Sequence, residues 1–313
     1  HTQVSRLRGV RYIDDYRLYF STASEAEKAL HALQRITYDF ELELNPTKTD
    51  ITELPEPIAS SWAAELRLHL FRRNRIAQRN DLIHYFSRAF EFANKLRDDS
   101  VLEYALNRIQ RLKVDVAIWC MYQAFLLNCV TANPGVIPTV IGILKAYQVL
   151  GYPQLKRDIS NTVQMMLRYH AQFNHSYELA WTLWLAKELK IRITAPAAKE
   201  LSQTQDPITA LVVLDLRQSG LMSKDLDTAG WNPLLTTSEL YTGNWLLSYE
   251  ANVKSRLPGN GADHVAPDDF FGTLKVLGVS FYDDAASIPI IELLPPEQFS
   301  GSAGIAVEPE GLY

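Results

Sequence analysis

The chain has 313 residues, of which 47% are hydrophobic, and it carries a formal net charge of −5 at pH 7. It is long enough for two or three domains and apolar enough to bury a sizeable core. The net charge excludes nucleic-acid binding driven by the charge of the protein as a whole. The charges are unevenly distributed, however, because residues 67–113 hold eleven Lys or Arg against five Asp or Glu, whereas residues 258–313 hold nine acids and one lysine. Residues 67–113, the basic belt, fit either a nucleic-acid channel on one face or Arg-rich helices with solvated outer faces.

Cys120 and Cys129 are the two cysteines, and both lie in apolar stretches of the sequence. Two buried thiols favour a reducing compartment without a disulfide framework. The most apolar stretch, Val114–Val130, is interrupted by polar residues and is too short to span a bilayer, so it predicts a core helix. Residues 1–11 are polar and basic with no apolar run behind them, so we expect no signal peptide. These features predict a cytoplasmic protein with no membrane segment.

The first segment of the chain has a mixed α/β pattern. Val10–Ile13 and Tyr16–Phe20 are short strand-like runs on either side of Asp14-Asp15, which predicts a hairpin. Thr22-Ala23-Ser24-Glu25 is a capping-box pattern. It opens a helix whose apolar residues recur every three or four positions as far as Phe40.

After this helix the pattern predicts two more strands. Apolar and acidic residues alternate over residues 40–44, Asn45-Pro46-Thr47-Lys48 turns the chain, and residues 49–54 can return as another strand. Pro55 and Pro57 then mark a boundary. Residues 1–58 are therefore predicted to form an α+β domain with the order hairpin, helix, strand, turn, strand.

From residue 59 to residue 257 the apolar spacing changes to that of helices. One apolar face runs from Leu82 to Leu96, and further helices are expected over residues 101–112, 114–130, 136–150, 158–173, 176–191, 206–218 and 238–256. Medium-length helices joined by short turns favour stacked helix pairs such as HEAT-like repeats, although no clean sequence period is present. Residues 258–313 are acidic and rich in Gly and Pro, and we expect a partly ordered segment with one short helix near residues 268–277. The whole chain is predicted to be mostly α.

Asp14 and Asp15 are adjacent carboxylates at the predicted hairpin turn. Nucleotidyl transfer uses two divalent cations about 4 Å apart to align the attacking hydroxyl and to neutralise the triphosphate. Mg²⁺ prefers carboxylate oxygens together with substrate phosphates. A tight turn at the rim of a sheet would present both carboxylates to a primer end, with at least one further carboxylate from a neighbouring strand. The pattern predicts a Mg²⁺ site, and a polar turn that binds nothing is the structural alternative.

Three other Asp-Asp pairs lack this context. Asp98-Asp99 has the pattern of a helix end followed by the N-cap of the next helix. Asp268-Asp269 has no strand-like flanks. Asp283-Asp284 follows a tyrosine but leads into the Pro-rich tail, so we do not expect it to bind a metal.

The segment Arg11-Tyr12-Ile13-Asp14-Asp15-Tyr16, followed by a helix and by Leu42-Glu43-Leu44-Asn45-Pro46-Thr47-Lys48-Thr49, resembles the last palm motifs of reverse transcriptases. The first part matches the Tyr-x-Asp-Asp box, and the second matches the Leu-x-Leu-Asn-x-x-Lys-Thr segment that follows it in bacterial members. The resemblance covers roughly residues 8–55. The long helical part behind it resembles bacterial defence-associated reverse transcriptases and abortive-infection polymerases, in which a helical-repeat domain replaces or extends the thumb.

The resemblance implies roles for individual residues. Asp14 and Asp15 would bind Mg²⁺, with Mn²⁺ as an alternative, and Lys48 would protonate or neutralise the leaving pyrophosphate. Three residues would contact the primer or the incoming nucleotide: Tyr12, Arg11 and Asn45. Structural roles stay open, because the tyrosine can fill a core, the lysine can be solvated, and the asparagine can hold the turn.

In the basic belt, five arginines are candidates for contacts with nucleic-acid phosphates: Arg67, Arg72, Arg73, Arg75 and Arg79. His69, Phe71 and Tyr85 lie among or just after them and are candidates for stacking on bases. A helix surface packed against its own domain is the alternative. His170 and His175 are five residues apart, which does not place them on one helical face, so their spacing does not predict a zinc site.

The resemblance implies an RNA-directed or template-independent DNA polymerase of an anti-phage defence system, acting on dNTPs by two-metal nucleotidyl transfer. Expected partners are a non-coding RNA template, the DNA product, and further copies of the chain or a second reverse-transcriptase subunit. A tyrosine hydroxyl is a candidate primer. Such enzymes carry a further metal-binding aspartate and the fingers before the Tyr-x-Asp-Asp box, so we expect residues 1–313 alone to be inactive. The rival hypothesis is a non-catalytic scaffold that binds RNA or a partner subunit through a degenerate palm and the helices.

Overall fold

The computed structural model describes residues 8–13, 15–46, 49–55, 61–97, 99–257 and 263–297. It is mostly helical, as predicted, and its chain divides into two compact units, residues 1–61 and residues 62–313. Each unit has its own architecture and is described separately.

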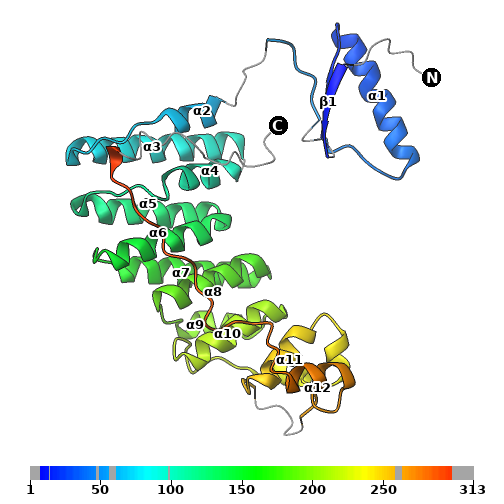
Figure 1. The fold of residues 1–313 in the computed structure, drawn as a ribbon, viewed down its shortest axis with the longest axis vertical. Coiled ribbons are helices and arrows are strands. Elements are labelled where there is room, and N and C mark those ends of the chain that lie inside the picture. The colour runs from blue at the N-terminus through cyan, green and yellow to red at the C-terminus, as the bar shows by residue number, and fades with distance from the viewer. Residues whose placement is uncertain are drawn as a thin grey trace. The chain divides into compact units, whose positions relative to one another are not determined.

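The first unit contains an antiparallel hairpin and one helix (Figure 1). Strand β1 (Arg8–Tyr12) pairs with β2 (Asp15–Tyr19), and helix α1 (Ala23–Asp39) follows. The helix begins at the predicted capping box, where Thr22 Oγ1 accepts a hydrogen bond from the Glu25 N–H. The predicted hairpin and amphipathic helix are therefore confirmed.

The two strands predicted after α1 are absent from the described residues, so this prediction is wrong. At the start of the first one, Glu41 has a left-handed φ of 56°, and Leu42 N–H donates to the Thr37 carbonyl at 2.9 Å. These contacts form a cap at the C-terminal end of α1. A strand is stabilised by pairing with a neighbour, and in the described chain β1 and β2 pair with each other alone. The alternating residues thus end a helix instead of extending a sheet.

The second unit is a stack of helices. Its α-helices are α2 (Ser61–Leu68), α3 (Arg75–Leu96), α4 (Ser100–Ile109), α5 (Trp119–Ala132), α6 (Ile137–Val149), α7 (Lys156–Gln172), α8 (Ser176–Leu189), α9 (Ala195–Leu201), α10 (Pro207–Gln218), α11 (Trp245–Val253) and α12 (Asp269–Val276). Short 3-10 helices are η1 (Val116–Ile118), η2 (Pro134–Val136), η3 (Ala229–Leu234) and η4 (Ser238–Tyr241). Short turns lie between them: the side chain of Asn133, for example, accepts a hydrogen bond from Gly135 N–H at 2.8 Å between α5 and η2.

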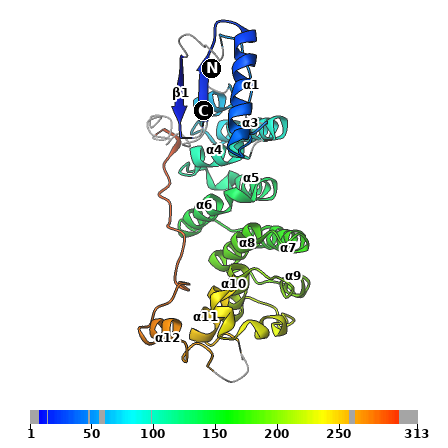
Figure 2. The same cartoon turned by 90° about the vertical axis from the view of Figure 1, so that its right-hand side faces the viewer.

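The helices of this unit form two layers. Helices α4, α6, α8, α10 and α11 pack one after another in one layer, and α5, α7 and α9 pack in the other. Figures 1 and 2 show the resulting elongated stack of the second unit. One continuous apolar core runs through it from Trp62 to Leu257, and it includes the stacked rings of Trp119 and Tyr147, whose centroids are 4.1 Å apart. Burial of each such side chain contributes about 1.5–3 kcal/mol, which explains why the apolar period locates most of these helices.

Some helix boundaries differ from the prediction. The helix expected from residue 114 begins instead at Trp119, because the Asp115 carboxylate accepts from Ala117 N–H at 2.8 Å and first opens the 3-10 turn η1. The helix expected over residues 238–256 is divided at Thr242, whose backbone is extended, into η4 and α11. Helices α2 and α9 have eight and seven residues and are too short to show a clear apolar period.

The chain after α12 returns along the helical stack. Helix α12 lies where the sequence predicts one, and residues 279–297, which we call the strap, then run past α11, α10, α8 and α6 (Figures 1 and 2). Near its end, Leu294 forms a parallel bridge with Leu112, three residues beyond the end of α4. The acidic tail predicted to be partly ordered thus includes a segment bound to its own helical unit.

Cys129 is buried as expected, and burial raises the pKa of its thiol to about 12. Cys120 is exposed, which contradicts the prediction. It follows the fully buried Trp119 in α5, and successive residues of a helix point about 100° apart, so the next position faces outward. No helix in the described part of the chain combines the length and apolar character needed to cross a membrane.

Candidate functional site

The hairpin places the predicted metal-binding residues at a tight turn. Tyr12 pairs with Asp15, so two residues, Ile13 and Asp14, connect the strands. Ile13 has a positive φ of 53°, as hairpin connections of this length require. Asp15 is exposed at the start of β2. Asp14 lies outside the described residues, and so does Lys48.

Arg11 is engaged within the hairpin itself. Its Nε donates to the Ile13 carbonyl at 2.8 Å, and its guanidinium lies 5.3 Å from the centre of the Tyr16 ring. These contacts fix the turn, whereas the predicted role of Arg11 is to bind the primer. Tyr12 is 57% exposed, so it does not fill a core within the described residues. Its predicted role beside a primer or nucleotide is compatible with this exposure and stays a prediction.

Asn45 lies beyond the cap of α1. Its backbone carbonyl accepts a hydrogen bond from Thr49 Oγ1 at 2.8 Å, which draws together the two ends of the predicted Asn-Pro-Thr-Lys turn. Asn45 is exposed, and the contact uses its main chain. The geometry therefore supports the structural role of this residue, and its predicted contact with the primer or nucleotide stays a prediction.

The first unit keeps large apolar side chains exposed among its described residues. No residue of α1 is buried, and the two apolar core clusters of the described chain begin at Trp62. Exposed residues include Val10, Tyr16, Ile36, Phe40 and Leu42, the last two at 72% and 64%. Large apolar side chains that stay exposed in this way suit a contact with another protein.

The five candidate arginines of the basic belt are all exposed, but two of them form ion pairs with acids of the protein. The Arg72 guanidinium pairs with Asp81 through Nε and Nη2, and its backbone N–H also donates to this carboxylate. Arg73 forms a long, exposed ion pair with Glu297 at 3.4 Å. A surface pair of this kind contributes little, so Arg73 can exchange it for a phosphate. Among the described residues, no ion pair is formed by Arg67, Arg75 or Arg79.

The aromatic residues of the belt do not lie at the surface. Phe71 is 3% exposed and Tyr85 is fully buried, so the expectation that they stack on bases is wrong. Their rings pack against each other at 5.2 Å and against His69. His69 is bound to the Asp81 carbonyl at 3.0 Å, and burial lowers its pKa. Charge and aromatic content locate the belt in the sequence, but they do not reveal which side of each helix its rings occupy.

Two histidines and a glutamate form a group that sequence spacing does not predict. His170 lies in the last turn of α7, and His175 directly precedes α8. The turn between the two helices brings their Nδ1 atoms within 3.1 Å of each other. Ligand atoms of these two residues and of Glu178 lie within 4.8 Å of one another, which makes them the described residues that could hold a metal ion through nitrogen and oxygen. Burial lowers the pKa of His170, which favours the neutral imidazole that binds metals. The turn places the three together although they do not share one helical face.

One open hollow of the helical unit is lined by basic residues. It has a volume of about 560 Å³ and lies between the start of α7 and the chain leading into α9. Its charged lining consists of Lys156, Lys190 and Arg192. This is a second positively charged surface of the helical unit, outside the predicted belt.

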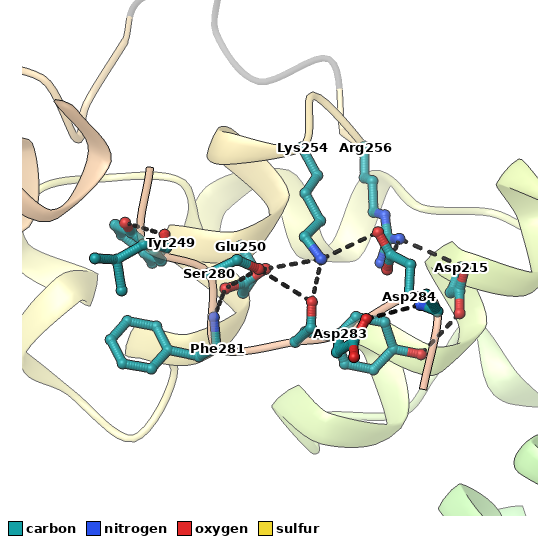
Figure 3. A network of polar contacts seen from close by, with 12 residues as sticks. Asp215, Tyr249, Glu250, Lys254, Arg256, Ser280, Phe281, Asp283 and Asp284 are labelled. Carbon is teal, nitrogen blue, oxygen red and sulfur yellow. Dashed lines mark hydrogen bonds and ion pairs between the residues drawn. The ribbon is translucent and has the colours of Figure 1, made fainter. Parts of the chain in front are cut away.

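Asp283-Asp284, the Asp-Asp pair excluded from metal binding on its sequence context, contributes instead to a polar network between the strap and α11 (Figure 3). Asp284 pairs with Lys254 at 3.1 Å and with Arg256. Burial raises the pKa of Asp284, but the hydrogen bonds from these two cations outweigh it and hold the pKa below its ordinary value. The carboxylate is therefore ionised and paired.

Comparison of the chain with protein-family models, with curated proteins and with solved structures finds no match.

Proposed function

We propose that the chain is part of a reverse-transcriptase-type DNA polymerase of a bacterial anti-phage defence system. The observation that carries this proposal is the Tyr-Ile-Asp-Asp sequence at a two-residue hairpin connection, with Asp15 exposed and paired across the sheet with Tyr12. A capped amphipathic helix follows the hairpin, in the order of the reverse-transcriptase palm. The residues of the hairpin turn and the segment after the helix, residues 42–49, resemble that family in sequence as well as in order.

The carboxylates fit Mg²⁺ or Mn²⁺, since both ions prefer oxygen donors. Asp14 and Asp15 would hold the ions, which supply charge neutralisation for the triphosphate and activation of the attacking hydroxyl. Lys48, a few residues beyond α1, would give a proton to the leaving pyrophosphate. A further carboxylate outside the hairpin would complete the site.

The helical unit would hold nucleic acid and partner subunits. Arg67, Arg75 and Arg79 offer exposed guanidinium groups for phosphates, and Arg73 can give up its weak pair with Glu297. A two-layer stack of this kind suits a HEAT-like repeat, which presents long surfaces for assembly. We therefore include a non-coding RNA template and an oligomeric or two-subunit assembly in the proposal.

The test is a double substitution in the complete gene product, Asp14→Ala with Asp15→Ala. Incorporation of labelled dNTPs in the presence of Mg²⁺, and protection of cells against phage, should both be lost. The matched control is Asp98→Ala with Asp99→Ala, a second Asp-Asp pair outside the hairpin, which should retain both. Incorporation that survives the first double substitution would exclude the polymerase.

A non-catalytic scaffold is the second candidate, and the exposed apolar surface of the first unit favours it. A hairpin and helix with no buried side chain suit a platform that packs against another protein. In that case Asp14→Ala with Asp15→Ala leaves phage protection intact, whereas charge substitutions at exposed apolar positions such as Phe40 and Leu42 abolish it. The two candidates therefore give opposite outcomes with the same pair of assays.

A further inference from the structure

The strap lies on the layer formed by α6, α8, α10 and α11, and this layer binds its main chain with charged side chains. At Ile288, the Glu188 carboxylate accepts the backbone N–H at 2.8 Å, while Lys145 Nζ donates to the backbone carbonyl at 2.6 Å. Lys145 and Glu188 also pair with each other at 2.7 Å. We call these two residues the α6–α8 clamp. One acid and one base thus hold both polar groups of a single residue in the strap.

A similar arrangement binds the strap nearer its start, at residues 281 and 282. Glu250 accepts the Phe281 N–H at 2.5 Å, and Lys254 donates to the Tyr282 carbonyl. Glu250 and Lys254, the α11 clamp, pair at 3.4 Å (Figure 3). Between the two clamps, Lys187 of α8 donates to the Asp284 carbonyl at 2.8 Å. Since these contacts go to the main chain, they recognise an extended peptide as the edge of a sheet does.

Two side chains of the strap add specificity. The Tyr282 hydroxyl donates to Asp215 at 2.8 Å, and its ring lies 5.0 Å from Lys254 Nζ and 5.3 Å from the Arg256 guanidinium. Asp284 pairs with the same two cations. A tyrosine face attracts cations, and a carboxylate two residues later neutralises them.

The charges of the groove favour an acidic occupant. Its side chains are four cations and three carboxylates, which leaves one positive charge unmatched: Lys145, Lys187, Lys254 and Arg256 against Glu188, Asp215 and Glu250. All seven are at most 16% exposed with the strap in place. Uncompensated charge in such surroundings is costly, and Asp284 of the strap supplies the missing negative charge.

An apolar notch completes the groove. Gly142 of α6 faces Ile291, and a Cβ at this glycine would lie 2.7 Å from Ile291 Cδ1 and 3.8 Å from Ile288 Cγ2. The absence of a side chain there admits branched aliphatic residues of the strap. Ile288 and Ile291 are half-buried against the helical core.

We propose that this face of α6, α8, α10 and α11 is a binding groove for an extended acidic peptide of a partner protein, and that the strap occupies it as an intramolecular competitor. The peptide carries a tyrosine, an acid two residues later, and branched aliphatic residues four and seven positions after the acid. This spacing is that of Tyr282, Asp284, Ile288 and Ile291 in the strap. The proposal is independent of the polymerase activity.

The strap has an exposed and irregular backbone, which allows it to leave the groove. Residues 283–287, 289 and 290 are exposed, and between α12 and the bridge at Leu294 the strap has no helix or strand. Segments with few buried apolar contacts open locally at low free-energy cost. A tethered segment has an effective concentration on the order of millimolar, so an outside peptide competes only when the strap is weakened or the peptide binds more tightly.

The experiment titrates a fluorescent synthetic peptide of residues 279–297 into the full chain and measures anisotropy. The strap is weakened in the chain by Tyr282→Ala with Asp284→Ala, which leaves the groove unchanged. The peptide should bind this variant at least about tenfold more tightly than the wild type, because the intramolecular competitor is lost. Asp283→Ala is the matched control, since the Asp283 carboxylate accepts only from Ala285 N–H of the strap itself at 2.8 Å in the described contacts. It should behave as wild type.

Two further arms locate the site and identify the occupant. Glu188→Gln in the weakened-strap chain should reduce peptide binding, and so should a peptide in which Asp284 is replaced by Asn. Sedimentation of the same samples tests whether the occupant is the strap of a second copy of this chain. If the wild-type chain self-associates and excess peptide dissociates it, the groove binds another copy's strap, and the proposal of a different partner protein is wrong.

Equal affinity of the peptide for the wild type and the folded, weakened-strap variant, or no binding to that variant, would overturn the proposal. If that variant does not fold, hydrogen exchange of the Phe281 and Ile288 amides is measured in the wild-type chain with millimolar peptide. Faster exchange of both amides supports displacement. Unchanged exchange means that the strap is a fixed part of the fold.

Discussion

Glu250 offers the sharpest test of the energetics of the strap. Its carboxylate is fully buried, accepts the Phe281 N–H at 2.5 Å and the Ser280 hydroxyl at 3.1 Å, and pairs with Lys254. In Glu250→Gln, one oxygen can still accept the Phe281 amide, but the new NH₂ group is buried beside a cation. Ser280 Oγ can accept one of its N–H groups, and the other has no acceptor. An unsatisfied buried donor costs about 1–3 kcal/mol, and loss of a charge-assisted bond adds about 1 kcal/mol. We expect a destabilisation of about 2–4 kcal/mol.

The assay combines thermal unfolding with hydrogen exchange. All six tryptophans lie at or after Trp62, so intrinsic fluorescence reports the helical unit alone. For a unit of this size the midpoint should fall by roughly 5–15 °C, and the Phe281 amide should exchange faster. Glu200→Gln, an exposed acid on α9, is the control and should change stability by less than about 0.5 kcal/mol. A Glu250→Gln variant as stable as this control, with Phe281 still protected, would refute the reasoning.

Three further outcomes are expected. Burial raises the pKa of Glu188, but the hydrogen bonds from Lys145, the Ile288 amide and the Ser287 hydroxyl outweigh it and lower the pKa below the ordinary 4.5. The stability that this group contributes is therefore full above pH 4.5 and is lost as the pH falls through the lower folded-state pKa. Denaturation midpoints between pH 6 and pH 3 should consequently depend less on pH in Glu188→Gln than in wild type. Gly142→Ala should leave the free energy of unfolding nearly unchanged, because a gain of about 1 kcal/mol in helix propensity offsets the cost of a rotamer shift of Ile291. Gly142→Leu should instead displace this part of the strap and speed hydrogen exchange of the Leu294 amide. Zn²⁺ should raise the melting temperature by binding to His170, His175 and Glu178, because two nitrogens and one carboxylate match zinc ligation. The increase should vanish in His170→Ala. If Zn²⁺ does not raise the melting temperature of the wild type, the two imidazoles form a hydrogen-bonded pair and no metal site.

Helices of the second unit could be predicted because their burial repeats every three to four residues. The apolar face beginning at Leu82 becomes the buried side of α3, and Asp206 caps α10 by accepting from Thr209 N–H at 2.7 Å. The hairpin and the capping box of α1 are also local patterns, so they could be identified before any tertiary contact was known.

Features that depend on distant contacts could not be predicted. The alternation after Phe40 suits a strand, but pairing requires a neighbour, and the helix cap prevails in its place. The strap has no apolar period, and its partners lie far away in the sequence, as in the contact between Arg111 and Glu292, which are 181 residues apart. The residues that bind it are mostly charged, and in sequence alone they are indistinguishable from the solvated face of a helix.

Loss of the strap should open the groove without unfolding the stack, because the ion pairs of the layer do not depend on the strap. Each clamp contains its own acid and base, and Lys187 pairs with Asp215 of the next helix at 2.8 Å. Arg256 keeps its contact with the same aspartate at 3.5 Å when Asp284 leaves. Only one positive charge is then unmatched, and water that enters the opened groove can solvate it. A structural brace would be expected to leave several buried charges unpaired on removal, since breaking a buried pair costs about 3–5 kcal/mol. The distribution of charge therefore favours an exchangeable occupant over a permanent brace.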